Sequence, residues 1–271
     1  TAGPERTFMD SKLIEALGDE LFHALRERRS VAPLTQRYPD LTLETAYHIS
    51  LRFLQRRQAL GEQVVGKKIG VTSRAVQEML DVHQPDFGFL TDRMQVGNDS
   101  DVSFETHRLV QPRAEGEIAF MLGQDLHGPG ITADDVMAAT HWVAPCFEIV
   151  DSRIVDWNIR IQDTVADNAS CGVFALGDER INPRELDLAK VQLNLRKNGQ
   201  PAGQGLGSAV QGHPCEAVAW LANTLGQFDI PFRKGEIILS GALAPLVPVL
   251  PGDDVSLTLS GLGSARLRFV S

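Results

Sequence analysis

Three glutamates give the clearest indication of chemistry in this chain. Glu115 and Glu117 stand two residues apart at the start of the apolar stretch RAEGEIAFML, and Glu148 lies within the apolar stretch WVAPCFEIVD. In a β-strand the side-chain period of two puts Glu115 and Glu117 on one face. Three carboxylates that leave coordination positions open suit Mg²⁺ or Mn²⁺ better than zinc. The open positions would accept water and a chelating substrate, such as a small 2-oxo acid.

An alternative is that these carboxylates are neutralised by the chain itself. Buried carboxylates repel one another and need positive charge nearby. Arg113 and Arg153 are close enough in sequence to supply it. The E-x-E pattern alone favours such ion pairs, whereas Glu148 inside an apolar strand favours the metal site.

A lysine is the second candidate for chemistry. In GKKIGVTS, Lys68 shares one strand face with Gly66 and Gly70, and Lys67 points to the other face. The flanking glycines predict room for a ligand to approach the backbone. Lys68 could then pair with a substrate carboxylate or move protons; the alternative is a solvated lysine on an edge strand.

An aspartate follows shortly after, in QPDFGFL. Asp86 precedes the aromatic Phe87, and an apolar neighbour raises a carboxyl pKa enough for general acid or base work. The alternative is a simple turn, since Pro, Asp and Gly are turn-forming residues.

The elements that must position these residues change in type along the chain. Residues 1–63 predict helices: leucines recur every four residues from Leu13, and Thr42 can cap a second helix. Residues 64–271 predict short strands, interrupted by helices that begin near Thr132 and Pro214. Turns such as PGD near Gly252 and GLGS near Gly263 predict mostly antiparallel pairing. We therefore expect an α+β protein with a helical N-terminal segment and a strand-rich catalytic domain.

Composition narrows the class of protein. The chain has 271 residues and a net charge of −9, and it lacks the basic surface that nucleic acids require. It has no apolar run long enough to span a membrane and no secretory signal pattern. Its three cysteines form no CxxC pair, which favours a reducing cytoplasm. P-loop, GxGxxG, GxSxG and HExxH motifs are all absent.

Taken together, the motifs resemble one family. The chain is similar to the 2-keto-4-pentenoate hydratases of the fumarylacetoacetase-like superfamily from about Leu41 to its end, through these segments: GKKIGVTS, QPDFGFL, RAEGEIAFML, FEIVDSRIVDW, DTVADNASCGVF, GHPCEAVAWLAN and IILSGALAPLVPV. The resemblance implies a strand-rich roll or sandwich with a mixed sheet after a small helical segment. It also implies a homo-oligomer.

The resemblance further implies roles for individual residues. Positions matching Glu115, Glu117 and Glu148 hold Mg²⁺ or Mn²⁺ in that family. Lys68, Asp86 and Ser170 fall on catalytic positions, and Thr72 and Ser240 line the substrate pocket. The implied reaction hydrates 2-hydroxypenta-2,4-dienoate to 4-hydroxy-2-oxopentanoate in the breakdown of aromatic rings after meta-cleavage.

Related activities remain as alternatives. The sister decarboxylase acts on 2-oxo-3-hexenedioate, and its sequences tend to have an apolar residue in place of Asp86. A second alternative is the hydratase for a longer dicarboxylate. In that enzyme the corresponding segment resembles GSFTRPVP, whose arginine suits a distal carboxylate, whereas this chain has Ala242, Leu243, Ala244 and Pro245 there. An extended alkyl dienoate is a further alternative substrate. The alternative that is not an enzyme is that this chain is a non-catalytic partner of a neighbouring enzyme in the pathway.

Overall fold

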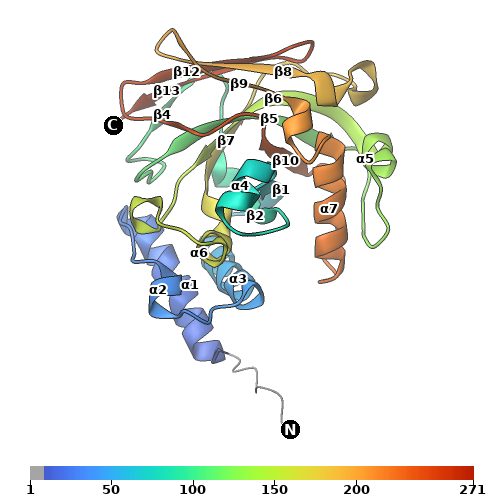
Figure 1. Cartoon of the computed structure of the whole chain (residues 1–271). Coiled ribbons are helices and arrows are strands. Elements are labelled where there is room, and N and C mark those ends of the chain that lie inside the picture. Colours follow the sequence, from blue (N-terminus) through green and yellow to red (C-terminus); the bar gives the residue numbers. More distant parts are fainter. Residues whose placement is uncertain (1–8) are drawn as a thin grey trace.

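Helices open the chain and two β-sheets follow them. The computed structural model describes residues 9–271 (Figure 1). α1 (Ser11–Glu27) packs against α3 (Leu43–Ala59), and the short α2 (Leu34–Arg37) lies between them in sequence. The Oγ1 atom of Thr42 accepts a hydrogen bond from the backbone N–H of Thr45, which confirms the predicted cap.

The core of these helices continues beyond the predicted boundary at residue 63. Leu21 and Phe53 belong to one apolar cluster with Ile161 and Val165 of α6 (Ile161–Ala166). All four side chains are largely buried. The helical segment therefore packs directly on the later part of the chain, and the boundary between two domains stays a prediction.

The larger sheet is curled into a roll. Its eight strands follow the order β2-β1-β10-β5-β6-β7-β3, with β11 paired to β5. The two edge strands are neighbours in sequence, because β2 ends at Thr91 and β3 begins at Gln95 after a single helical turn, η1 (Asp92–Met94). The sheet must therefore curve until its edges nearly meet. Its strands span Val64–Gly70 (β1), Asp86–Thr91 (β2), Gln95–Val96 (β3), Arg113–Leu122 (β5), Thr140–Val150 (β6), Cys171–Leu176 (β7), Ile237–Ala242 (β10) and Val247–Pro248 (β11).

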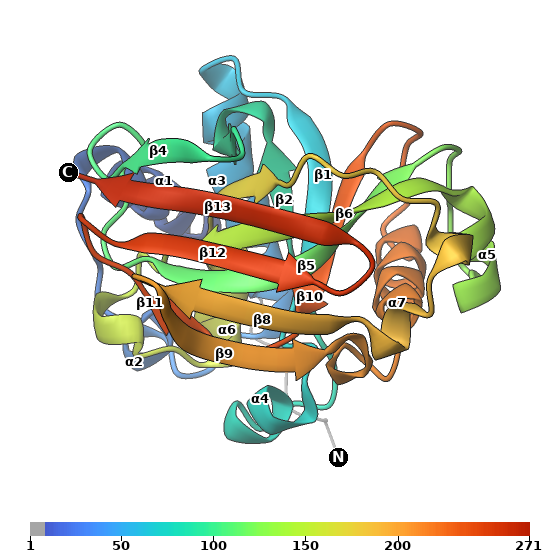
Figure 2. The ribbon, with the colours of Figure 1, turned by 90° about the horizontal axis from the view of Figure 1, so that it is seen from above.

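A second sheet covers the outside of this roll. Its order is β4-β13-β12-β8-β9, and Figure 2 shows it lying across β5 and β6. Apolar side chains of both sheets meet helix α7 (Pro214–Gly226) and α5 (Ala133–Ala139) in one large core. The strands span Ser100–Ser103 (β4), Gln192–Lys197 (β8), Gln200–Leu206 (β9), Asp254–Leu259 (β12) and Gly263–Val270 (β13).

The structure confirms the predicted α+β class and the strand-rich roll. Most strand pairs are antiparallel, while β1–β10, β3–β7 and β4–β13 are parallel, so the sheets are mixed. Thr132 and Asp135 form the predicted capping box of α5, and Pro214 opens α7.

Three local expectations were wrong or incomplete. The PDFG segment is no turn: Asp86 begins β2, which pairs with β1. The turn at Gly252 joins β11 to β12, which lie in different sheets, so it makes no hairpin. Helices α4 (Arg74–Met79) and α6 were not expected, because both are only six residues long and too short to show a helical period.

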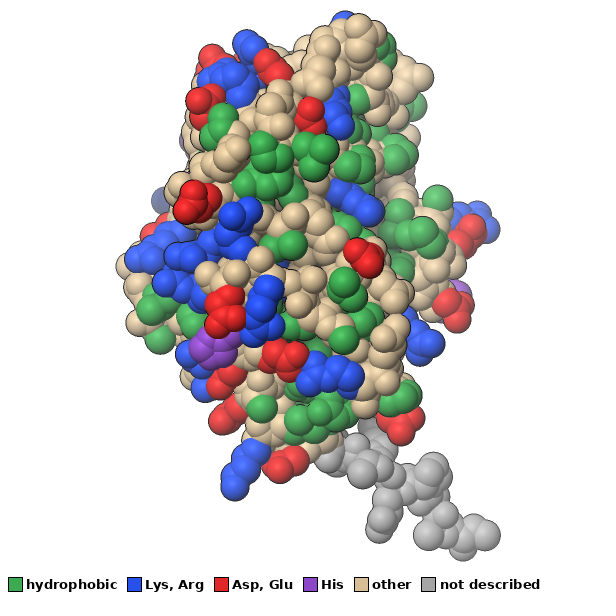
Figure 3. Space-filling view, turned by 90° about the vertical axis from the view of Figure 1, so that its left-hand side faces the viewer, with side chains coloured by type: hydrophobic (Ala, Val, Ile, Leu, Met, Phe, Trp, Pro, Cys, Tyr) green, Lys and Arg blue, Asp and Glu red, His purple; other side chains and the backbone are tan. Residues whose placement is uncertain are grey.

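The surface carries interspersed charges. Figure 3 shows one face, on which several basic side chains gather on the left and acidic ones lie scattered among apolar and neutral ones. Exposed ion pairs contribute to this mixture, such as Arg266 with Asp254 and Arg268 with Asp101. None of the helices between residues 9 and 271 combines the length and the apolar character needed to cross a bilayer.

Candidate active site with a carboxylate cluster

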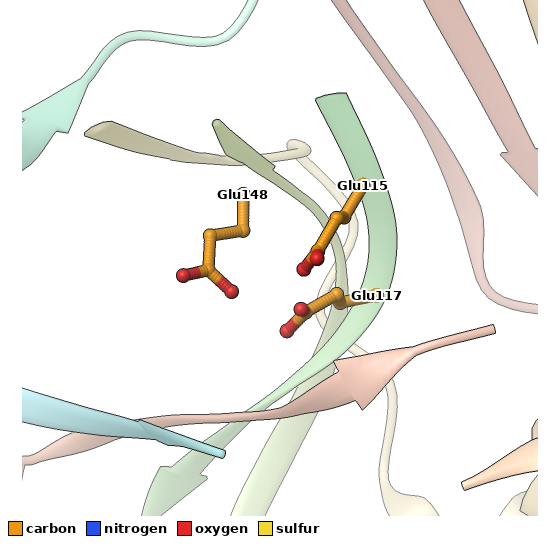
Figure 4. Close-up of side chains that lie close together, drawn as sticks. All are labelled: Glu115, Glu117 and Glu148. Atoms are coloured by element: carbon orange, nitrogen blue, oxygen red, sulfur yellow. The ribbon is translucent and has the colours of Figure 1, made fainter. Parts of the chain in front are cut away.

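The three predicted glutamates meet on the inner face of the roll. Glu115 of β5 is the direct cross-strand partner of Glu148 of β6, and Glu117 lies two residues further along β5. One carboxylate oxygen from each lies within 4.8 Å of the others (Figure 4). Alternation along β5 and β6 sends Ile118 and Phe147 to the opposite face, into the large core. We call Glu115, Glu117 and Glu148 the glutamate cluster.

The glutamate cluster has oxygen atoms left without hydrogen-bond partners. Glu117 and Glu148 are 0% and 1% exposed. Within the described residues, Glu117 Oε1 and Glu148 Oε2 have no partner, and Glu148 Oε1 makes no hydrogen bond but lies 3.1 Å from the ammonium of Lys68. Buried polar atoms are normally satisfied. Converging, unsatisfied carboxylate oxygens fit a hard divalent cation, which takes oxygen ligands.

Crowding changes the acidity of these groups. Burial, followed by the charge of Glu148, raises the pKa of Glu115 from 4.5 to about 7. The same two causes and the charge of Glu115 raise the pKa of Glu117 well above 4.5. The cluster therefore binds protons more tightly than free carboxylates unless positive charge arrives.

Lys68 supplies one positive charge from the chain itself. Its Nζ lies 3.1 Å from Glu148 Oε1 and donates a hydrogen bond of 2.8 Å to the carbonyl of Ala169. Burial lowers the pKa of Lys68, but the negative charge of Glu148 and its neighbours outweighs burial and raises that pKa above its usual value. Lys68 is therefore a buried ammonium. Lys67 points the other way, to Glu236 and the ring of Phe232.

The glycines beside Lys68 do not leave room for a ligand as predicted. A Cβ atom at Gly66 would collide with the backbone carbonyl of Ile237 on β10. A Cβ atom at Gly70 would collide with the carboxylate of Asp86. The absent side chains let β10 and Asp86 pack closely against β1, so the glycines serve the chain's own packing.

Asp86 lies next to Lys68 and is buried. It is the cross-strand partner of Gly70, and its side chain is 4% exposed. Burial raises the pKa of Asp86, while Lys68 opposes that rise. Its Oδ1 has no hydrogen-bond partner among residues 9–271. A carboxyl group with a free oxygen and a raised pKa can accept or donate a proton.

Ser170 belongs to an unusual turn beside the same lysine. Asn168, Ala169 and Ser170 all have positive φ, at 54°, 51° and 56°. Left-handed backbone costs about 1–3 kcal/mol for each non-glycine residue, so the surrounding structure must hold it. The Ser170 hydroxyl lies 3.1 Å from that of Thr164.

Thr72 and Ser240 lie together at the end of β10. A Cβ atom at Gly241 would collide with the side chain of Thr72, so the two residues pack closely. Ser240 is fully buried, and its Oγ donates a 2.8 Å hydrogen bond to the carbonyl of Ile118. The backbone N–H of Gly241 donates to Glu117 Oε2 at 3.3 Å. These residues therefore hold β10 against the glutamate cluster.

The alternative ion pairs with arginine are wrong. Arg153 is fully buried and binds Asp167, with 2.7 Å between Nε and Oδ1. The Arg113 guanidinium stacks on the ring of Trp157 at 4.6 Å from its centre. Neither arginine neutralises the glutamate cluster.

Sequence reasoning missed two neighbours of the site. Cys146 faces Glu117 across the β5–β6 pair, so it completes a square with the three glutamates; period-two alternation in CFE could have shown this. Ala169 contributes its backbone carbonyl to Lys68, and no side-chain pattern could have indicated that contact.

Comparison with known proteins places this arrangement in a family. Residues 58–270 match the family model described as fumarylacetoacetate (FAA) hydrolase C-terminal. The chain belongs to the FAA hydrolase family. Within that family, a 2-hydroxyhexa-2,4-dienoate hydratase of Comamonas testosteroni is 63% identical over 260 residues, covering 96% of this chain and 98% of the relative. A 2-hydroxypent-2,4-dienoate hydratase of Pseudomonas putida is 60% identical over 222 residues, covering 82% and 100%.

A solved structure of the FAA hydrolase family has nearly the same fold. The 4-oxalocrotonate decarboxylase from Pseudomonas putida G7, complexed with magnesium and adipate, superposes with a TM-score of 0.94 at 33% identity. The match covers 97% of this chain and 99% of that chain. The predicted family is confirmed, and the hydratases are much more similar in sequence than this decarboxylase.

Proposed function

We propose that this protein is a metal-dependent hydro-lyase that adds water to 2-hydroxypenta-2,4-dienoate and forms 4-hydroxy-2-oxopentanoate. The observation that carries the proposal is the glutamate cluster, with its unpartnered oxygens, beside Lys68 and Asp86. The high identity to dienoate hydratases supports the same activity. The protein would act in the breakdown of aromatic compounds; the alternative substrate is a longer dienoate, such as the hexadienoate in the name of the Comamonas relative.

Glu115, Glu117 and Glu148 would hold Mg²⁺, with Mn²⁺ as a substitute. When bound, the ion would supply Lewis acidity toward the substrate's carboxylate and C2 oxygen. The magnesium of the decarboxylase structure supports this choice of cation. The three carboxylates outnumber the single ammonium of Lys68, and their raised pKa values mean that they hold protons unless further positive charge is present, so a divalent cation is electrostatically favoured.

The proton transfers are assigned to this chain's own residues. Hydration needs loss of the C2 hydroxyl proton and gain of a proton at C5, which gives a conjugated 2-oxo-3-enoate; water then attacks C4, and the resulting enolate takes a proton at C3. Asp86 would take the proton of that water, because its free oxygen is buried and its pKa is raised. Lys68 would stabilise the substrate's oxygen end, and Ser170 would orient it. Thr72 and Ser240 would shape the pocket.

The same proposal includes the setting of the enzyme. We infer a cytoplasmic homo-oligomer; the free and buried state of all three cysteines supports the reducing compartment. Association with a neighbouring enzyme of the pathway would pass on the 4-hydroxy-2-oxo acid.

Product analysis tests the function. Purified protein with Mg²⁺ is given 2-hydroxypenta-2,4-dienoate, its hexadienoate homologue and 2-oxo-3-hexenedioate in separate reactions. We expect loss of dienoate absorbance, formation of the 4-hydroxy-2-oxo acid and no CO₂ from the diacid. Release of CO₂ from the diacid would establish the decarboxylase, the alternative activity, which is that of the 33% identical solved structure.

Asp86→Asn tests the assignment of the base. Asn has the same shape but cannot accept the proton, so we expect hydration to fall by about 10²–10⁴-fold. Thermal unfolding provides the control for folding. Unchanged hydration in a folded Asp86→Asn protein would remove Asp86 from the mechanism.

A further inference from the structure

The left-handed turn at residues 168–170 contacts Lys68, contains Ser170 and packs on β2, the strand that carries Asp86. Its middle carbonyl, on Ala169, accepts from Lys68 Nζ at 2.8 Å. Its last residue is Ser170. Its first residue, Asn168, lies directly over β2, the strand that begins with Asp86. A displacement of this turn would therefore move Lys68 and Ser170 relative to Asp86.

Asn168 joins the turn to β2 through a pair of hydrogen bonds. Its Oδ1 accepts from the backbone N–H of Phe89 at 2.8 Å, and its Nδ2 donates to the carbonyl of Phe89 at 3.0 Å. The side-chain amide thus pairs with the strand as another strand would. Asn168 is 3% exposed, so water cannot readily replace these bonds.

The packing under the turn is equally close. A Cβ atom at Gly88 would collide with the backbone carbonyl of Asn168. Gly88 is the cross-strand partner of Lys68, on the strand next to it. The glycine of the QPDFGFL motif therefore admits the turn against the very pair of strands that carries Lys68 and Asp86.

We propose that Asn168 is a positioning residue. By pairing with Phe89 it holds three consecutive left-handed residues in place, and it thereby fixes the Ala169 carbonyl on Lys68 and sets the distance between Lys68, Ser170 and Asp86. This inference rests on the proposed hydratase function, because it assigns these three residues to one reaction. Reacting groups that shift by about 1 Å lose up to about 100-fold in rate.

The chain offers a matched control at Asn223. Its side-chain amide makes the same pair of bonds to one residue: Oδ1 accepts from the Ile131 N–H at 2.8 Å, and Nδ2 donates to the Ile131 carbonyl at 2.9 Å. Asn223 lies on α7 and contacts the loop at Gly128. If the amide of Asn168 had only a structural role, substitutions at Asn168 and at Asn223 would change kcat to the same extent.

The experiment compares Asn168→Asp and Asn168→Ala with Asn223→Asp and Asn223→Ala. An aspartate keeps the acceptor for the Phe89 N–H but loses the donor. We expect both Asn168 variants to lose about 10- to 100-fold in kcat with little change in KM, and both Asn223 variants to keep wild-type kcat. Equal kcat values for folded Asn168 and Asn223 variants would overturn the proposal.

A second variant covers the case in which Asn168→Ala fails to fold. Gly88→Ala keeps Asn168 but places a Cβ against its carbonyl, so the same loss of kcat is expected. Wild-type kcat in folded Gly88→Ala contradicts the proposal.

A crystal structure of Asn168→Asp gives a readout independent of activity. We expect the distance from Lys68 Nζ to the Ala169 carbonyl to exceed hydrogen-bond length. An unchanged contact rejects the inference. If the wild-type protein hydrates none of the dienoates, the proposed function fails, and the structure alone decides the role of Asn168.

Discussion

The turn at residues 168–170 lies near two groups of buried charges that are satisfied in opposite ways. One is the glutamate cluster. The other, which we call the α6 charge cluster, consists of Asp151, Arg153, Asp163 and Asp167, each at most 1% exposed. Both lie in interiors where an isolated charge is costly. They differ in what surrounds each oxygen.

In the α6 charge cluster every carboxylate oxygen has a partner. Asp167 binds the backbone N–H and the Nε of Arg153, and Asp151 accepts from the N–H groups of Val110 and Gln111. Asp163 accepts from Thr35 and from the N–H of Arg160. In the glutamate cluster, three oxygens within the described chain have no hydrogen-bond partner, although one of them, Glu148 Oε1, lies 3.1 Å from Lys68. Buried charges whose oxygens all have partners indicate a structural role, whereas buried carboxylates without hydrogen-bond partners indicate a site where a ligand binds.

The largest expected effect separates the two clusters by function. Glu117→Gln removes one negative charge but keeps the shape and an acceptor for the Gly241 N–H. We expect hydration to fall by about 10²–10³-fold or more. The rise in melting temperature on adding Mg²⁺ should disappear, while the melting temperature in EDTA stays the same or rises.

Glu236→Gln is the control for that variant. This glutamate pairs with Lys67, away from the cluster, so its loss should leave the Mg²⁺-induced rise intact. A Glu117→Gln protein that keeps both the rise and the activity would show that Glu117 is not a metal ligand.

The next effect concerns stability. Arg153→Met leaves Asp167 buried without its ion-pair partner, and we expect a loss of about 3–5 kcal/mol in the free energy of unfolding, measured with urea. Arg266→Ala, at an exposed ion pair with Asp254, should leave the free energy of unfolding almost unchanged. Similar losses in the two variants would contradict the structural role of the α6 charge cluster.

A smaller loss is expected at the N-terminal helices. The Thr35 hydroxyl donates to Asp163 at 2.7 Å, and Thr35→Val removes this bond to a buried carboxylate. We expect a loss of about 1.5–3 kcal/mol in urea unfolding. Thr106→Val, on the surface, should stay within about 0.5 kcal/mol of wild type. A Thr35→Val protein as stable as Thr106→Val would mean that Asp163 needs no side-chain donor.

The last prediction concerns the pH dependence of stability. Burial and the charge of Glu148 raise the folded-state pKa of Glu115 to about 7, above its ordinary value of 4.5. The folded protein therefore holds this proton more tightly, so the stabilisation is complete below pH 4.5 and is lost as pH rises through about 7. In EDTA, the contribution of Glu115 lowers the melting temperature across that window. Glu115→Gln should remove this part of the slope; a slope identical to wild type would assign it to other groups.

The glutamate cluster was predictable because alternation along a strand is independent of tertiary detail. Glu115 and Glu117 had to share a face once their stretch was a strand, and Glu148 followed from its apolar surroundings. The orientation of Lys68, away from Lys67, followed from the same rule. The helix caps at Thr42 and Thr132 were equally local.

What the sequence could not show depended on contacts between distant segments. The turn at Asn168 has no glycine to mark its positive φ, and its shape is held by Phe89, which lies 79 residues earlier. The residues PDFG favour a turn locally, which made a turn the alternative at Asp86. The segment is a strand because its pairing with β1 outweighs that local preference. The roles of Gly66 and Gly70 depend on which backbone lies over them.

The place of β10 between β1 and β5 has a consequence for synthesis of the chain. The hairpin of β5 and β6 brings the three glutamates together from residues that are close in sequence. Lys68 of β1 pairs with Leu239 of β10, and β10 lies between β1 and the glutamate-bearing β5. The strand that links Lys68 to the glutamates is therefore synthesised about 170 residues after Lys68. A nascent chain that ends before Ile237 therefore contains the acidic residues of the site without the strand that brings their counter-ion to them.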